Sequence, residues 1–259
     1  MIRNRLKEKL AAGTAALGAA ISIPSTETVE LLARMNFDWL FVDTEHSPLS
    51  PELLGPLLQV GRLGEATPVV RVMSHDAAAI KKCLDVGAQG IIVPWVNNRE
   101  QAEAAVRAAR YPPQGLRGFG PRWLALAGED MMTYNREANE QILVIVQIET
   151  LEAVENFESI VSTPGVDGFM IGPADLANSM GFPGDFGNPA VEEMIAQIAK
   201  RGRKVNALAA YPAAPPSLCR KRIEQGFRMV CLGSDLSLLR LGAQSVLESV
   251  GRPLYAPRA

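Results

Sequence analysis

The sequence has few of the residues that build thiolate sites, disulfide frameworks or imidazole-rich centres. Its 259 residues include three cysteines and two histidines, and aromatic residues make up 6%. Cys83, Cys219 and Cys231 are an odd number, lie far apart and form no Cys-x-x-Cys pair. This pattern argues against a zinc-thiolate site and a disulfide framework, and it suits a reducing cytoplasm.

The chain also lacks a strong charge of either sign and any long apolar run. Its net charge is −2, so we expect no nucleic-acid partner and no binding to an anionic membrane. No run of 18 apolar residues could span a bilayer. The segment 11–23, behind a basic start, resembles a weak signal peptide, but it is mostly Ala and Gly. We expect it to form a short helix that leads into a first strand.

Short apolar runs alternate with amphipathic stretches along the chain. The apolar runs predict strands at 17–23, 39–43, 68–73, 90–96, 142–148, 168–171, 204–209 and 228–232. The segments between them predict helices at 24–35, 51–63, 76–86, 99–110, 151–161, 191–201, 214–225 and 236–250, with a further helical insert before 140.

Eight apolar strands that alternate with helices predict a parallel sheet covered on both faces. Eight such units in a chain of this length are typical of a closed (β/α)8 barrel, here a single α/β domain over residues 1–259. The alternative is an open doubly wound sheet, which favours a glycine-rich first turn. The segment 23–26, Ile-Pro-Ser-Thr, holds no glycine.

Polar residues follow several of the predicted strands, at the end where barrel enzymes place their active sites. The third strand carries Arg71, and a guanidinium in an apolar strand needs an anionic partner. Gln147 and Glu149 are two positions apart and so share one face of the fifth strand. Asp175 follows the sixth strand and Asp235 the eighth. Helix capping would equally explain Asp175 or Asp235, and pairing with a surface arginine would explain Glu149.

The second strand ends in Asp43-Thr44-Glu45-His46. An Asp/His pair at a barrel mouth fits a general base near neutral pH, so we expect Asp43 to orient His46. Two carboxylates, with few histidines, favour a hard or borderline divalent cation such as Mg²⁺ or Mn²⁺, with Co²⁺ and Zn²⁺ left open. Such a cation would polarise a chelating 2-oxo acid.

These residues lie in segments that resemble a known family. Residues 37–48, FDWLFVDTEHSP, resemble the signature of the HpcH/HpaI aldolases, the class II, metal-dependent pyruvate aldolases that include 2,4-dihydroxyhept-2-ene-1,7-dioate aldolases. Residues 84–90, 110–118, 146–149 and 167–176 match further blocks of that family, in order. The resemblance extends over residues 17–250 and implies a barrel of the phosphoenolpyruvate/pyruvate type. It also implies that the last helix is exchanged between subunits of a homo-oligomer, usually a hexamer.

The resemblance assigns roles to individual residues. It implies that Glu149 and Asp175 hold the metal, and that Arg71 binds the pyruvyl oxygen and steadies the enolate. His46, oriented by Asp43, would act as acid and base through a metal-bound water.

Further residues are implied to bind the substrate or to lie at an interface. Gln147, Gly172 and the backbone of Ala174 and Asp175 would hold the substrate, and Asp85 would reach the site of a neighbouring subunit. The implied reaction is the reversible cleavage of a 4-hydroxy-2-oxo acid to pyruvate and an aldehyde.

Other functions fit parts of the same pattern. A citrate-lyase-like enzyme acting on CoA thioesters and an oxaloacetate decarboxylase would use related chemistry, and a non-catalytic small-molecule-binding barrel is the remote alternative. A Schiff-base aldolase needs a desolvated lysine inside the barrel. Of the lysines only Lys204 is expected to open a strand, and it lies at the wrong end. The proline-rich segment 211–216 departs from the family pattern and leaves the acceptor aldehyde open.

Overall fold

Eight parallel strands close into a barrel in the computed structural model, which describes residues 3–252. Each strand pairs with its sequence neighbour, and β8 pairs with β1 to close the barrel. The strands are β1 (Ala16–Ile21), β2 (Trp39–Asp43), β3 (Thr67–Arg71), β4 (Gly90–Val93), β5 (Leu143–Ile148), β6 (Gly168–Ile171), β7 (Leu208–Tyr211) and β8 (Met229–Ser234). The predicted closed barrel is therefore confirmed.

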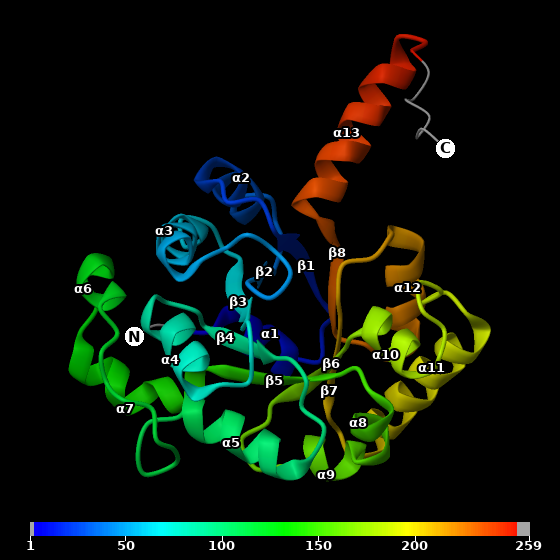
Figure 1. The fold of residues 1–259 in the computed structure, drawn as a ribbon. Helices are drawn as coiled ribbons and strands as arrows, with labels where there is room; N and C mark the ends of the chain where they lie inside the picture. The colour runs from blue at the N-terminus through cyan, green and yellow to red at the C-terminus, as the bar shows by residue number, and fades with distance from the viewer. Residues whose placement is uncertain (1–2, 253–259) are drawn as a thin grey trace.

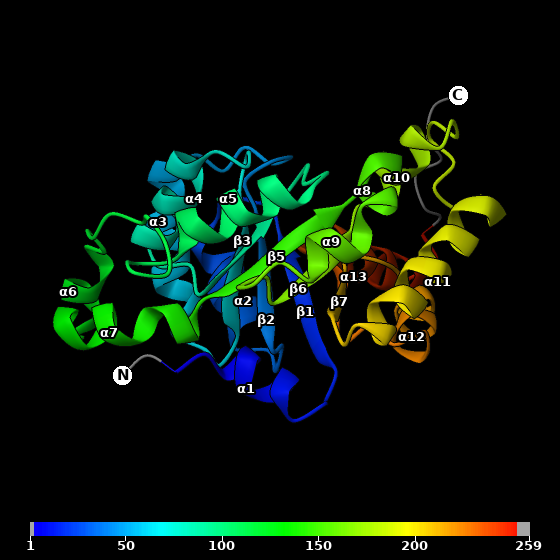
Figure 2. The ribbon, with the colours of Figure 1, turned by 90° about the horizontal axis from the view of Figure 1, so that it is seen from below.

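Helices surround the barrel and cover its outer face, as Figures 1 and 2 show from two directions. Their bounds are α1 (Arg5–Ala11), α2 (Thr26–Ala33), α3 (Pro51–Gly61), α4 (Ala77–Asp85), α5 (Arg99–Ala109), α6 (Trp123–Ala127), α7 (Met131–Gln141), α8 (Leu151–Glu155), α9 (Phe157–Val161), α10 (Pro173–Ser179), α11 (Pro189–Lys204), α12 (Pro216–Glu224) and α13 (Asp235–Ser249).

The barrel interior is filled by side chains at alternate strand positions, because successive residues of a strand face opposite sides of the sheet. Large residues on one strand meet small ones on the next. A Cβ atom added to Gly18 on β1 would lie 2.5 Å from the ring of Trp39 on β2, so the glycine makes room for the indole. Leu6 of α1 joins this inner cluster. The barrel is thus a packed core over most of its height, and only its ends are open to ligands.

Helix starts follow from local sequence. Ser25, Asp76, Asn98 and Thr150 each accept a hydrogen bond from a backbone N–H in the first turn of the following helix. These side chains satisfy donors that the helix itself leaves unpaired. They fix where each helix begins, and with it the position of the strand-to-helix loop above the barrel.

Several predicted segments differ from the structure. The short helix expected at the start of segment 11–23 lies earlier, because α1 ends at Ala11 and β1 begins at Ala16. The strand predicted at 204–209 is found at Leu208–Tyr211, because α11 continues to Lys204. Basic residues end this helix, where a positive charge is favourable. Lys204 therefore ends a helix and opens no strand. The helix predicted at 151–161 is divided at Asn156, and the helical insert consists of α6 and α7.

The last helix, α13, extends away from the barrel (Figure 1). Asp235 is its only buried residue, Leu238 is half-buried, and most of its other apolar side chains are exposed. None of the helices in the described part of the chain is both long and apolar enough to cross a membrane. That residues 1–259 form one domain remains a prediction, because 1–2 and 253–259 lie outside the described residues.

Candidate active site

Asp43 and Arg71 form an ion pair at the carboxyl ends of β2 and β3, where they are register partners. Arg71 donates from Nε to Asp43 Oδ1 at 2.9 Å and from Nη2 to Oδ2 at 2.7 Å. Burial alone would raise the pKa of Asp43, but the hydrogen bonds and charge of Arg71 lower it overall. The fork leaves Nη1 of Arg71 without a protein hydrogen bond among the described residues. The guanidinium is therefore fixed in place and still has a free donor.

Glu45 lies on the other side of the same guanidinium, and sequence reasoning gave this residue no role. Its side chain is 10% exposed, and its Oε2 lies 3.2 Å from Nε of Arg71. Burial raises the pKa of Glu45, Arg71 lowers it, and the charges of Asp43 and Asp175 raise it further. The sequence could have pointed to Glu45, because it lies between Asp43 and His46, which were both assigned roles.

His46 is placed differently from what was expected. Its imidazole Nε2 lies 3.7 Å from Glu45 Oε2, and the side chain is 59% exposed. Asp43 accepts a hydrogen bond from the backbone N–H of His46 at 3.3 Å, while both its carboxylate oxygens bind Arg71. In this structure Arg71 binds the Asp43 carboxylate and Glu45 lies nearer to the ring, so an orienting role of Asp43 toward the imidazole stays a prediction.

Gln147 and Glu149 rise together from β5, as their spacing predicted. Gln147 donates from Nε2 to Glu149 Oε2, and the backbone N–H of Trp95 donates to Oε1 at 2.7 Å. Glu149 is buried, and burial raises its pKa against these two hydrogen bonds, with Glu45 and Asp175 raising it further. The Oε1 atom of Gln147 is buried and has no hydrogen-bond partner among the described residues. An unpaired acceptor at this depth is costly unless a ligand or water binds it.

Gly172 and Asp175 follow β6. A Cβ atom on Gly172 would lie 2.5 Å from Glu149 Oε2, so the glycine is needed for the carboxylate to fit. The N–H of Gly172 donates to Ile148 O at 3.1 Å, and therefore cannot donate to a substrate as well. Ala174 and Asp175 lie in the first turn of α10, where backbone donors have no partner within the helix.

The side chains at this mouth suit a divalent cation. The charges of Glu45 and Asp175 raise the pKa of Glu149, so the carboxylates lie near enough to repel one another. No group of three or more His, Cys, Asp or Glu side chains within residues 3–252 is arranged to hold a metal. Glu149 and Asp175 would thus supply two ligands and leave the rest to water and substrate, which Mg²⁺ tolerates well.

Asp85 and Asp235, which the sequence analysis also named, bind other groups of the chain. Asp85 ends α4 and pairs with Arg117 of the same chain at 2.8 Å, at the opposite end of the barrel from the mouth. A contact of Asp85 with a neighbouring subunit stays a prediction. Asp235 accepts hydrogen bonds from the backbone N–H groups of Ser22 and Ile23, and so fixes the loop after β1.

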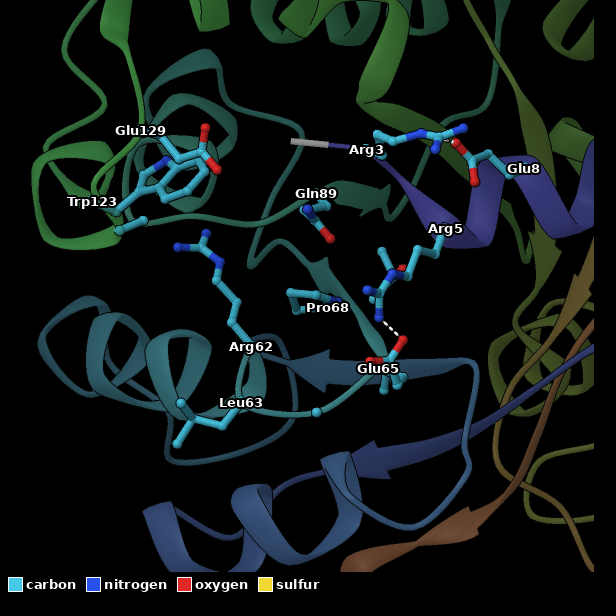
Figure 3. A pocket seen from close by; sticks show the side chains of 14 residues that line it. Arg3, Arg5, Glu8, Arg62, Leu63, Glu65, Pro68, Gln89, Trp123 and Glu129 are labelled. Carbon is cyan, nitrogen blue, oxygen red and sulfur yellow. Dashed lines mark hydrogen bonds and ion pairs between the residues drawn. The ribbon is translucent and has the colours of Figure 1, made fainter. Parts of the chain in front are cut away.

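A cavity of about 530 Å³ lies at the amino-terminal end of the strands (Figure 3). Its arginines have partners: Arg3 pairs with Glu8 and Arg5 with Glu65, while the Arg62 guanidinium stacks on Trp123 at 3.6 Å from the ring centroid. Enzymes with this fold place their catalytic residues at the carboxyl ends of the strands, which is the opposite end of the barrel. The mouth with Arg71 and Glu149 is therefore the candidate active site.

Comparisons with known proteins identify aldolases that are similar to this chain over nearly its whole length. The chain is 39% identical over 255 residues to the hydroxypyruvate/pyruvate aldolase of Pseudomonas aeruginosa, covering 96% of this chain and 92% of the relative. It is 40% identical to the 4-hydroxy-2-oxo-heptane-1,7-dioate aldolase of Salmonella arizonae, covering 96% and 95%.

A solved structure and a family model give the same result. An HpcH/HpaI aldolase/citrate lyase family protein from Burkholderia cenocepacia superposes with a TM-score of 0.90 at 33% identity, covering 95% of this chain and 99% of that one. Residues 22–241 match the family model. The chain belongs to the HpcH/HpaI aldolase/citrate lyase family.

Proposed function

We propose that the protein is a class II pyruvate aldolase, which cleaves a 4-hydroxy-2-oxo acid to pyruvate and an aldehyde and catalyses the reverse addition. The observation that carries this proposal is one fixed guanidinium, Arg71, beside three carboxylates at the mouth of the barrel. Cationic and anionic groups so arranged can bind a 2-oxo acid and stabilise the charge that develops on its carbonyl oxygen. The names of the relatives support the same reaction.

Arg71 would stabilise the negative charge that forms when the C3–C4 bond breaks. The bond's electron pair moves into the 2-oxo group and yields the enolate of pyruvate, while the C4 hydroxyl loses its proton and becomes the aldehyde. The free Nη1 of Arg71 would donate to the enolate oxygen. Asp43 would keep the guanidinium oriented, because its two oxygens bind Nε and Nη2.

His46 would move the protons. Its exposed imidazole would accept the proton of the C4 hydroxyl and return one to C3 of the enolate. Glu45, 3.7 Å from Nε2, would keep the ring in place between these two steps. Gln147 and the backbone N–H groups of Ala174 and Asp175 would hold the substrate oxygens.

A divalent cation, Mg²⁺, Mn²⁺ or Co²⁺, would be held by Glu149 and Asp175 and would act as a Lewis acid on the 2-oxo acid. A Schiff-base mechanism lacks support. Lys7 and Lys9 are half-buried on α1, and the other five lysines are exposed. Such positions supply no desolvated amine inside the barrel.

We further propose that the chain forms a homo-oligomer through α13. Leu239 and Val246 of this helix are 66% exposed, and Val250, which directly follows it, is 70% exposed. An apolar groove between α2 and α13 continues this surface. Exchange of α13 between subunits would bury it, and neighbouring subunits would then place Asp85 near a partner's site. The three free, buried cysteines support a cytoplasmic location.

A screen for pyruvate release tests the proposed reaction. Hydroxy-oxo acids of varied chain length and charge are incubated with the protein and Mg²⁺, Mn²⁺ or Co²⁺. We expect release that EDTA abolishes and added metal restores. Arg71→Ala should abolish deuterium exchange at C3 of pyruvate. Unchanged exchange in that variant, or release that resists EDTA, would contradict the proposal.

A further inference from the structure

Trp95 lies beside the candidate active site, on the loop between β4 and α5, and has no assigned role. It is a bulky residue with φ of +57°, in the left-handed region that side chains with a Cβ atom rarely adopt. Such backbone conformations persist where the surrounding structure imposes them, and they gather at functional sites. The conformation directs its backbone N–H to Glu149 Oε1 at 2.7 Å.

The loop is fixed to the neighbouring strand-to-helix connection. Thr150 Oγ1 donates to Asn97 Oδ1 at 2.5 Å, and Asn156 Nδ2 donates to Asn97 O at 2.9 Å. Thr150 directly follows Glu149 in the chain. The loop and the Glu149 carboxylate therefore move as one unit, and the position of Trp95 follows that of Glu149.

The side chain of Trp95 reaches a second carboxylate of the same site. Its indole lies beside the carboxyl group of Glu45 and lowers the pKa of that group. Glu45 in turn lies 3.2 Å from Arg71 Nε and 3.7 Å from His46 Nε2. One residue thus links the carboxylate proposed to hold the metal with the carboxylate beside the two groups proposed to act on the substrate.

We propose that Trp95 is a positioning residue that fixes Glu149 through its backbone and Glu45 through its indole, so that Glu45 holds Arg71 and His46 in their working orientation. This inference rests on the proposed function. The inference goes beyond the proposed function because it assigns one task to the backbone of Trp95 and another to its indole. Those tasks can be separated, because a substitution removes the indole and keeps the backbone N–H.

Two variants remove the indole donor in different ways. Trp95→Phe keeps an aromatic ring without an N–H, and Trp95→Gly keeps the backbone N–H and tolerates the positive φ. We expect each to lower kcat for C3 exchange of pyruvate about five- to tenfold, since the contact of the indole N–H with a charged group is lost. Binding of Mn²⁺ should change less than about twofold, because the backbone contact with Glu149 persists. Loss of Mn²⁺ binding in both variants, or unchanged kcat, would overturn the inference.

A double-mutant cycle separates positioning from a general structural effect. Glu45→Gln should lower kcat at least as much as Trp95→Phe, and the double variant should be no slower than Glu45→Gln alone, because both act through one contact. If the two losses multiply, the residues act independently and the inference fails.

A spectroscopic measurement keeps the test valid even if no exchange is found. Trp95 is 46% exposed, whereas Trp39 and Trp123 are 0% and 4% exposed. Glu45→Gln should therefore change the emission of Trp95, and the change should vanish in a Trp95→Phe background. An identical spectrum with and without Glu45 would refute the contact. Absence of C3 exchange in the unmodified protein would instead refute the proposed function.

Discussion

Replacing Gly172 by alanine tests how closely the candidate site is packed. The backbone at Gly172 has φ of −100° and ψ of 86°, so its φ is one that alanine adopts. The obstacle is steric. The new Cβ atom would lie 2.5 Å from Oε2 and 2.7 Å from Cβ of Glu149, and 2.9 Å from Nε2 of Gln147. Because Cβ of Glu149 is fixed to its strand, the carboxylate or the β6 backbone has to move.

The expected magnitude follows from these contacts. Overpacking of this kind costs about 1–3 kcal/mol, and the reduced entropy of the unfolded chain returns about 0.4–1 kcal/mol. A net loss of roughly 1–2 kcal/mol would lower Tm by about 2–4 °C in a chain of this size. Displacement of a proposed metal ligand should weaken Mn²⁺ binding about 10–100-fold, as loss of a supporting contact does in metal sites.

The assay combines calorimetric Tm, Mn²⁺ titration and pyruvate C3 exchange. Gly55→Ala is the matched control, because no heavy atom lies within 4 Å of its new Cβ in the middle of α3. It should leave Mn²⁺ binding unchanged and change the free energy of unfolding by less than about 1 kcal/mol, because the following Pro56 offsets the gain that alanine brings to a helix. If Gly172→Ala binds Mn²⁺ as tightly as the unmodified protein, the reasoning about this site is refuted.

Four further outcomes follow from the same structure. Arg222 is fully buried against Glu192 and Tyr211, so Arg222→Ala should lower the free energy of unfolding by about 3 kcal/mol, measured in urea; a loss below about 1 kcal/mol would contradict this. Burial raises the pKa of Glu192 but Arg222 and Lys221 lower it overall, so this stabilisation should be present above the ordinary glutamate pKa, fall as pH drops through the lowered value, and be smaller in the variant, where Lys221 still pairs with Glu192. Asp43→Asn should slow C3 exchange about 10–100-fold with the fold retained by circular dichroism, because Arg71 loses a charged partner; an unchanged rate would argue against its orienting role. Borohydride treatment with pyruvate should add no mass to the protein, since no lysine is buried, and a trapped adduct would exclude the metal-dependent mechanism.

Much of the candidate site could be predicted from strand ends. Arg71, Gln147 and Glu149 were found because a polar side chain in an apolar parallel strand needs a local reason, and the register of the barrel brings them to one end. Glu45 and Trp95 could not be found in this way. They lie on loops, where polar and aromatic residues are common, and their contacts join β2, β3, β4 and β5, which are far apart in sequence.

The sequence by itself determined the closed barrel, because eight alternating apolar and amphipathic segments can bury their faces in few other ways. It also determined most element boundaries, through local caps and prolines. Only the tertiary structure decided which partner each charged group takes. Asp43 could bind His46 or Arg71, and the pairing of β2 with β3 places the guanidinium against both of its oxygens. Which of two possible partners a charged group binds depends on distances between neighbouring strands. The spacing of residues along the chain does not give these distances.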